Sequence, residues 1–412
     1  MHYLAAAILI IFPSTILGLN KIYGLAAIVA ICVGFFYMYK NKNQIIPLSQ
    51  AEKIIFFSVS LLYFSALMTA LYNNVSLGRS SQYYTFVMII PTYYFFKFCP
   101  GDKEKYLWTG LILGSFIALG IGSYDIVFGN KFFRAHGVLN PNIFGPIALI
   151  MGAMSLASLG WFKERQQSMI IVPIIALLSG ILASLLSLSR GVWVALFTLI
   201  FLYIWYSYKH LSRKTFSIVI IAITLSFGII YNIPIFKMQQ RFDIAIVQTS
   251  NYFDSDSTSN LSGLGSIDAR LEMWKAALLI FKENPLLGAG WAKNYNIELN
   301  LLIEQKLINA SISKYQEAHS IYLSSMAKGG LLALAGIFAL FFIPLIFFIK
   351  ILSHRSSSPS QQRIALAGIL LLVSIIFNGL SESLLEKSTT INFLAFYLAV
   401  FLALASNKLE IK

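Results

Sequence analysis

Three side chains of the 412-residue sequence have the chemistry of a site that binds phosphate beside a proton acceptor: His319, Arg190 and Arg270. A histidine near its unperturbed pKa of about 6.5 is largely neutral at pH 7 and can take a proton from a hydroxyl. Guanidinium groups bind phosphate oxygens with bidentate geometry. Several cations beside one titratable base therefore favour a site that holds an anionic group while a proton is moved.

Each of these residues alone also has a structural interpretation. His319 would be an interfacial residue that caps or packs at a helix end, and Arg190, in a very tight turn between two apolar segments, would be an interface anchor. Arg270 would be a solvated residue on a helix face. Because all three residues are expected on one side of the protein, a shared functional role is favoured over three separate structural roles. Four further cations are candidates for secondary contacts with the anion: Arg134, Arg241, Lys328 and Lys387.

The elements that carry these residues are expected to be transmembrane helices. Hydrophobic residues make up 58% of the chain and charged residues 12%, against about 25% charged in an ordinary soluble domain. A bilayer core needs roughly 20 apolar residues per helix, with every backbone polar group bonded internally. Twelve apolar runs meet this need, at residues 3–19, 22–39, 54–72, 83–99, 106–128, 142–161, 169–188, 191–208, 216–236, 318–349, 364–381 and 390–406.

The predicted fold is thus an all-α polytopic integral membrane protein with about twelve transmembrane helices. Residues 1–236 hold nine of them, residues 237–316 form one large loop, and residues 317–412 hold the last three. The first run lacks the charged n-region and cleavage site of a removable signal peptide, so it is expected to stay as an anchor. Cys32 and Cys99 lie at different depths in this topology, which predicts no disulfide.

The distribution of positive charge predicts the orientation of the helices. The net charge of +14 alone would allow a nucleic-acid partner, but Lys and Arg collect in the short loops on the cytoplasmic side of membrane proteins. We number the links between consecutive apolar runs from the N-terminus. The even-numbered links and the C-terminus carry sixteen Lys and Arg residues, whereas the short odd-numbered links carry six. Both termini are therefore expected in the cytoplasm, the loop in the periplasm of a bacterium, and no nucleic acid is expected as a partner.

The loop is expected to contain coil over residues 250–265 and then one amphipathic helix that carries Arg270. Ser266 or Asp268 can cap this helix, and Pro285 and Gly288 end it. Its expected apolar face, resting on the bundle or at the lipid headgroups, consists of Leu271, Trp274, Leu278 and Phe281.

His319 is expected at the level of the lipid headgroups. Residues 329–349 would span about 31 Å at 1.5 Å per residue, which is enough for the hydrocarbon core and places Lys328 near the outer interface. If the helix is continuous, His319 lies roughly 13 Å further out.

Four segments together resemble the O-antigen ligase and O-antigen polymerase superfamily. The segments are Ser189-Arg190-Gly191 with Val192-Trp193; Arg270 and Trp274 with residues 284–290; His319-Ser320 with Gly330 and Gly336; and residues 137–145 with Asn140-Pro141-Asn142. The resemblance is carried by their order and topology over most of the chain, since no single motif is specific. In the segment that begins at His319, the family often has a second glycine at the position where this sequence has Ala333.

The resemblance implies a GT-C-like glycosyltransferase, an O-antigen ligase of lipopolysaccharide biosynthesis. It would transfer a glycan from undecaprenyl pyrophosphate to the lipid A core oligosaccharide at the periplasmic face of the bacterial inner membrane. Membrane lipids would surround the enzyme as further partners. At the positions that match the family's motifs, the resemblance implies that His319 is the general base and that Arg190 and Arg270 hold the donor pyrophosphate. Attack opposite the leaving group would invert the anomeric centre.

No cofactor and no metal is expected. The first outward link, around Asn20 and Lys21, is too short for the acidic motif of metal-dependent lipid-linked glycosyltransferases, and the loop has no His and carboxylate cluster at ligand spacing. Glu382 and Glu386 on the last outward link are expected to pair with Lys387 or nearby arginines. A nucleotide-sugar donor is disfavoured, because the sequence has no phosphate-cradling glycine loop.

Three other functions stay open at this point. A polymerase that joins repeat units on the same carrier would share the fold and motifs, and a related enzyme would transfer glycans to protein. A flippase for lipid-linked sugars belongs to another class, and it would be expected to show internal repeats, broken helices and charges at mid-membrane. The sequence shows no matched broken segments, its charges gather at helix ends, and Pro173 and Pro344 are single kinks.

Overall fold

The computed structural model describes residues 1–19, 22–42, 48–129, 134–208, 212–234, 238–254, 266–291 and 293–406. All regular secondary structure within these residues is helical, which confirms the predicted all-α class. The helices are α1 (His2–Thr15), α2 (Ile22–Lys40), α3 (Gln50–Tyr72), η1 (Gly78–Tyr83), α4 (Tyr84–Val87), α5 (Ile89–Phe98), α6 (Lys103–Val127), α7 (Pro141–Leu156), α8 (Leu159–Arg165), η2 (Gln167–Met169), α9 (Val172–Leu186), α10 (Gly191–Tyr208), α11 (Arg213–Asn232), α12 (Met238–Asp254), α13 (Ser266–Glu283), α14 (Lys293–Glu304), η4 (Ala310–Ile312), α15 (Ile321–Ser353), α16 (Pro359–Asn378), η5 (Leu384–Glu386) and α17 (Ser388–Ala405).

Each of the twelve predicted apolar runs coincides with one helix or with two consecutive ones. Among the described residues, eight helical stretches are long and apolar enough to cross a membrane, and α1 and residues 191–205 of α10 are shorter apolar helices. The chain is therefore a multi-pass membrane protein, while the count of twelve spans stays a prediction. Cys32 and Cys99 are both free.

The run at residues 83–99 is broken into α4 and α5, which the sequence pattern did not predict. Pro91 has no N–H to donate, and its ring would clash with the carbonyl of Val87 four residues earlier. The α-helical ladder therefore stops at Met88 and restarts at Ile89.

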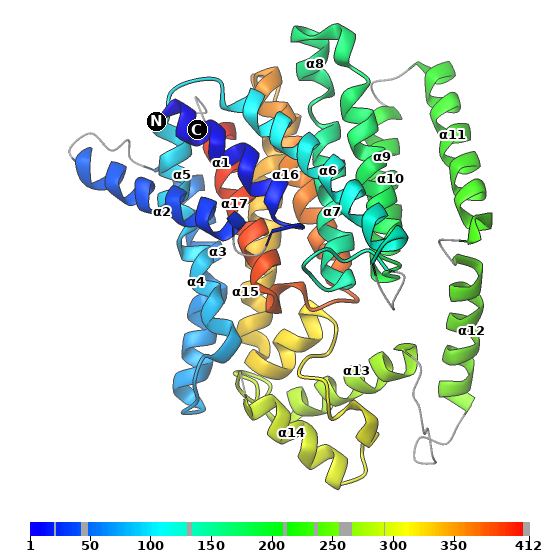
Figure 1. Cartoon of the computed structure of the whole chain (residues 1–412). Coiled ribbons are helices and arrows are strands. Elements are labelled where there is room, and N and C mark those ends of the chain that lie inside the picture. Colours follow the sequence, from blue (N-terminus) through cyan, green and yellow to red (C-terminus); the bar gives the residue numbers. More distant parts are fainter. Residues whose placement is uncertain are drawn as a thin grey trace.

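The centre of the bundle is formed by α7, α16 and α17, which the other helices surround (Figure 1). Small residues let the surrounding helices approach this centre closely, as is usual in membranes. On α9, a Cβ added to Gly180 would lie 2.6 Å from the Ala148 carbonyl oxygen of α7.

At one end of the bundle α13, α14 and η4 form a cap, opposite the end where α1 begins and α17 finishes, and α12 stands at the side below α11 (Figure 1). The cap and α12 correspond to the predicted loop. The expectation of coil from residue 250 is wrong for residues 250–254, which form the last turn of α12, and the rest of that coil, residues 255–265, lies outside the described residues. Neither α12 nor α14 was predicted.

The amphipathic helix is present as α13, but the face that was expected to rest on the bundle or at the lipid headgroups is not the face that packs inside the protein. Leu278 is 44% exposed, and Leu271, Trp274 and Phe281 are half-buried. Smaller side chains allow α13 to pack closely in the cap and against α15, so the buried face is Ala269, Met273, Ala276, Ala277 and Ile280.

The helix after His319 is not continuous. Gly330 interrupts α15 with φ 63° and ψ −157°, a conformation that favours glycine. The interruption brings residues 285–290 alongside the helix: Leu331 N–H donates to the Pro285 carbonyl over 2.8 Å, and Ala289 N–H donates to that of Ala327 over 2.9 Å. The estimate of 13 Å for His319 assumed a straight helix and does not apply.

Candidate functional site

His319 lies at the junction between the cap and α15. Its backbone has φ 47°, an uncommon conformation for a non-glycine residue that turns the chain into the helix. Ser320 follows as the N-cap of α15, and Ile321 N–H donates to the Gly379 carbonyl over 2.8 Å. The imidazole is thereby held facing the link between α16 and α17, with 19% of the side chain exposed.

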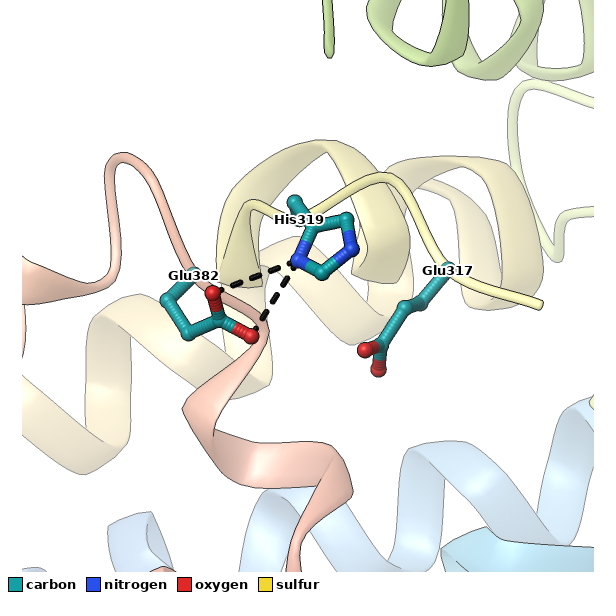
Figure 2. A group of neighbouring side chains, drawn as sticks. All are labelled: Glu317, His319 and Glu382. Atoms are coloured by element: carbon teal, nitrogen blue, oxygen red, sulfur yellow. Dashed lines mark hydrogen bonds and ion pairs between the residues drawn. The ribbon is translucent and has the colours of Figure 1, made fainter. Parts of the chain in front are cut away.

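The carboxylate of Glu382, on that link, is the partner of His319. The Nδ1 atom of His319 lies 3.2 Å from each carboxylate oxygen (Figure 2). Because an ionised carboxylate only accepts hydrogen bonds, Nδ1 carries the proton in a neutral imidazole. The other ring nitrogen, Nε2, is then the proton acceptor.

Glu382 also connects His319 to the arginines. Arg270 of α13 places Nη2 3.9 Å from Glu382 Oε2. Asn142, at the start of α7, donates from Nδ2 to the same oxygen over 3.1 Å and accepts from Arg134 Nη2 over 3.1 Å. Arg134 Nε donates to the Ser187 carbonyl over 2.8 Å, so its guanidinium is held by two acceptors.

Arg190 approaches the same place from the turn between α9 and α10. The turn fits closely against the α16–α17 link, since a Cβ on Gly191 would lie 2.4 Å from Ser381 Oγ. Burial lowers the pKa of Arg190, and the nearby Arg270 lowers it further. Burial likewise lowers the pKa of Arg134, followed by the charges of Arg190 and Arg270. The guanidiniums of Arg134 and Arg190 still stay charged, because arginine is not deprotonated in proteins.

The predicted lysines pair with carboxylates other than Glu382. Lys387 pairs with Glu317 (Nζ to Oε1, 2.8 Å), and Lys328 is buried in a pair with Glu386 (Nζ to Oε1, 2.5 Å). Burial raises the pKa of Glu386, and the charge of Lys328 opposes this shift. The ion pair of Glu386 is with Lys328, and the charge of Lys387 also acts on Glu386. Glu382 has the arginine partner that was expected. The side chain of Arg241, on α12, lies outside the described part of the structure.

Glu317, His319 and Glu382 bring one ligand atom each to within 4.8 Å of one another, a spacing that a metal ion could use. Linear spacing did not reveal this group, because Glu382 lies 63 positions after His319. Each carboxylate already has a cationic partner, Lys387 for Glu317 and Arg270 for Glu382. The charge that would attract a divalent cation is thus largely compensated.

The network contains the arginines 134, 190 and 270 and Lys387 against two carboxylates. Its excess positive charge is suited to an anion, and its proton acceptor lies at the edge of that charge. Sequence reasoning missed Asn142, Glu317 and the contact of Glu382 with His319. Asn142 had a signal in the Asn140-Pro141-Asn142 segment, whereas Glu317 had only its place two residues before His319.

Comparison with known proteins gives two findings. Residues 174–338 match the family model described as O-Antigen ligase. A protein of Haemophilus influenzae (strain ATCC 51907 / DSM 11121 / KW20 / Rd), described as an uncharacterized protein, is 25% identical over 381 residues, which cover 92% of each chain. The family match confirms the resemblance seen in the sequence. It includes Arg190, Arg270 and His319, while Arg134, Asn142 and Glu382 lie outside it.

Proposed function

We propose that this protein is an O-antigen ligase, which transfers a glycan from undecaprenyl pyrophosphate to the lipid A core oligosaccharide. The family match over residues 174–338 supports a glycosyltransferase of O-antigen processing. The observation that carries the proposal is the pairing of His319 Nδ1 with Glu382 next to three converging arginines. A base beside an excess of fixed positive charge suits a neutral nucleophile and an anionic leaving group.

The acceptor hydroxyl is activated by His319. Nε2 takes the hydroxyl proton while the oxygen forms a bond to the anomeric carbon of the donor sugar. Glu382 keeps the proton on Nδ1 and stabilises the imidazolium that forms, as the carboxylate does in a Ser-His-Asp triad. A positioned base of this kind contributes about 10² to 10⁴-fold to the rate.

The leaving group is stabilised by Arg190, Arg270 and Arg134. As the bond from the anomeric carbon to the pyrophosphate oxygen breaks, its electron pair stays on that oxygen. Fixed guanidiniums stabilise this growing charge more than they stabilise the bound donor, which lowers the barrier. Attack from the face opposite the leaving group inverts the anomeric centre, and the chemistry of these residues needs no cofactor.

The proposed location is the inner membrane of a bacterium, with both termini in the cytoplasm and the cap in the periplasm. The asymmetry of Lys and Arg between the links supports this orientation. In this orientation, the site faces the periplasm, where the carrier-linked glycan and the lipid A core would come together.

Lipopolysaccharide analysis of a deletion strain tests the reaction. A ligase predicts bare core together with long glycan chains that accumulate on the lipid carrier. Core that bears one repeat unit would instead indicate the polymerase, and carrier-linked units trapped in the cytoplasmic leaflet would indicate a flippase.

The role of the base is tested by His319→Ala. The variant should insert normally and lose transfer, measured with purified protein and carrier-linked donor. Transfer at the wild-type rate would contradict the role of His319.

A further inference from the structure

Glu317 is a buried carboxylate with an unused oxygen. Its side chain is 9% exposed, and Oε1 accepts a hydrogen bond from Lys387. The second oxygen, Oε2, is fully buried and has no hydrogen-bond partner among the described residues. An ionised carboxylate can accept about four hydrogen bonds, and a buried acceptor that lacks a donor is destabilising. This oxygen therefore has the properties of a group that is completed by a ligand.

The Glu317 carboxylate lies beside the catalytic face of the proposed base. It is within 4.8 Å of ligand atoms of His319 and Glu382. Figure 2 shows the imidazole between the two carboxyl groups: Nδ1 faces Glu382, and the second ring nitrogen lies on the side of Glu317. A molecule that donates a proton to Nε2 would thus come next to Glu317.

The charges around Glu317 favour a neutral hydrogen-bond donor as its ligand. Lys387 already compensates Glu317, and Arg270 compensates Glu382, so a further cation would be repelled by the charges of Lys387 and Arg270. An anionic ligand would be repelled by the carboxylate. A sugar hydroxyl is neutral, donates one hydrogen bond and matches the empty acceptor.

We infer that Glu317 and His319 form the acceptor-sugar subsite: the attacking hydroxyl donates to His319 Nε2, and a neighbouring hydroxyl of the same sugar donates to Glu317 Oε2. Tyr315, half-buried and edge-on to the His319 ring with centroids 5.8 Å apart, adds an apolar wall for the sugar C–H groups. This inference rests on the proposed function. It separates the acceptor, on the Glu317 side of the imidazole, from the donor pyrophosphate among the arginines.

The test measures acceptor and donor separately for Glu317→Gln and Lys387→Met. Purified full-length protein is assayed for binding of isolated lipid A core without donor, and for the KM of each substrate during transfer. Glu317→Gln should weaken acceptor binding and raise the acceptor KM by about 10- to 100-fold, the worth of a hydrogen bond to a charged group, and leave the donor KM unchanged. Lys387→Met breaks the same ion pair but keeps the carboxylate, so its effect on the acceptor should be clearly smaller. Glu304→Gln, which removes an exposed carboxylate of the cap, is the control.

Several outcomes would overturn the inference. Equal losses in Glu317→Gln and Lys387→Met would mean that only the ion pair matters, and an acceptor KM within twofold of the wild type would remove Glu317 from the subsite. Transfer that stops in EDTA and returns with Mg²⁺, Mn²⁺ or Ca²⁺ would assign the carboxylates to a metal.

The same assay distinguishes failure of the proposed function. Wild-type protein that fails to use lipid A core but binds carrier-linked repeat units refutes the ligase reaction, and the Glu317 comparison is then made with that acceptor. Wild-type protein that binds neither acceptor overturns both proposals.

Discussion

At the scale of single residues, Glu382 has the most contacts with the rest of the site. Its carboxylate is shared by His319, Asn142 and Arg270, which come from three separate elements. Replacement of one partner of such a network leaves the others misaligned, and its effects are not additive. Glu382 is therefore a sharper probe of the site than any one of the cations.

Glu382→Gln should reduce kcat by about 10²-fold or more, because the amide favours the wrong tautomer of His319 and cannot stabilise an imidazolium. The acceptor KM should change little, since Glu382 does not contact the acceptor in the proposed arrangement. Steady-state kinetics on folded, membrane-extracted protein measures both values. A variant with wild-type kcat would show that His319 does not depend on this carboxylate.

Arg190→Lys and Arg270→Lys should each lower transfer by at least about tenfold. Lysine keeps the charge but loses the planar fork that binds two phosphate oxygens at once. The loss should appear with the carrier-linked donor as the varied substrate. Arg355→Lys, at an exposed arginine between α15 and α16, is the matched control and should retain activity. Full activity of both site variants would contradict the proposed contact with pyrophosphate.

At the scale of elements, the interruption of α15 shapes the site. Residues 285–290 are hydrogen-bonded to backbone groups on both sides of Gly330, and these residues join α13, with Arg270, to the helix that follows His319. A Cβ at position 330 would lie 2.4 Å from the backbone of Leu286. The spaced glycine after His319 is thus explained by close backbone packing.

Gly330→Ala should therefore lower both stability and transfer. The positive φ costs about 1–3 kcal/mol for a residue with a Cβ, and the clash with Leu286 adds to this. The melting temperature of purified protein should fall by several degrees. Gly120→Ala on α6 is a suitable control, because nothing lies within 4 Å of an added Cβ there. Equal melting temperatures of the two variants would refute this role of Gly330.

The sequence predicts the helices well and the contacts between them poorly. Twelve apolar runs coincide with helices because a bilayer allows few other structures for such segments. The break at Pro91 could have been inferred locally, from its clash with Val87. The contact of His319 with Glu382 could not, because it joins residues 63 positions apart through the packing of α15 against α16. The buried face of α13 was missed because alanines, which carry little hydrophobic signal, pack more closely than leucines.

At the scale of the whole molecule, the cap and the site share one end of the bundle, so the orientation of the chain determines which compartment supplies the substrates. Glu304 is the last residue of α14, in the cap, and Arg355 follows the end of α15; both are exposed. In a background with Cys32 and Cys99 replaced by serine, Glu304→Cys should react with a membrane-impermeant maleimide once the outer membrane is permeabilised. Arg355→Cys should react only after the inner membrane is opened. The reverse pattern would place His319 and the arginines on the cytoplasmic side, where a glycan already moved to the outer leaflet of the inner membrane could not reach them. That result would refute the proposed ligase reaction even if every side-chain contact in the site were correct.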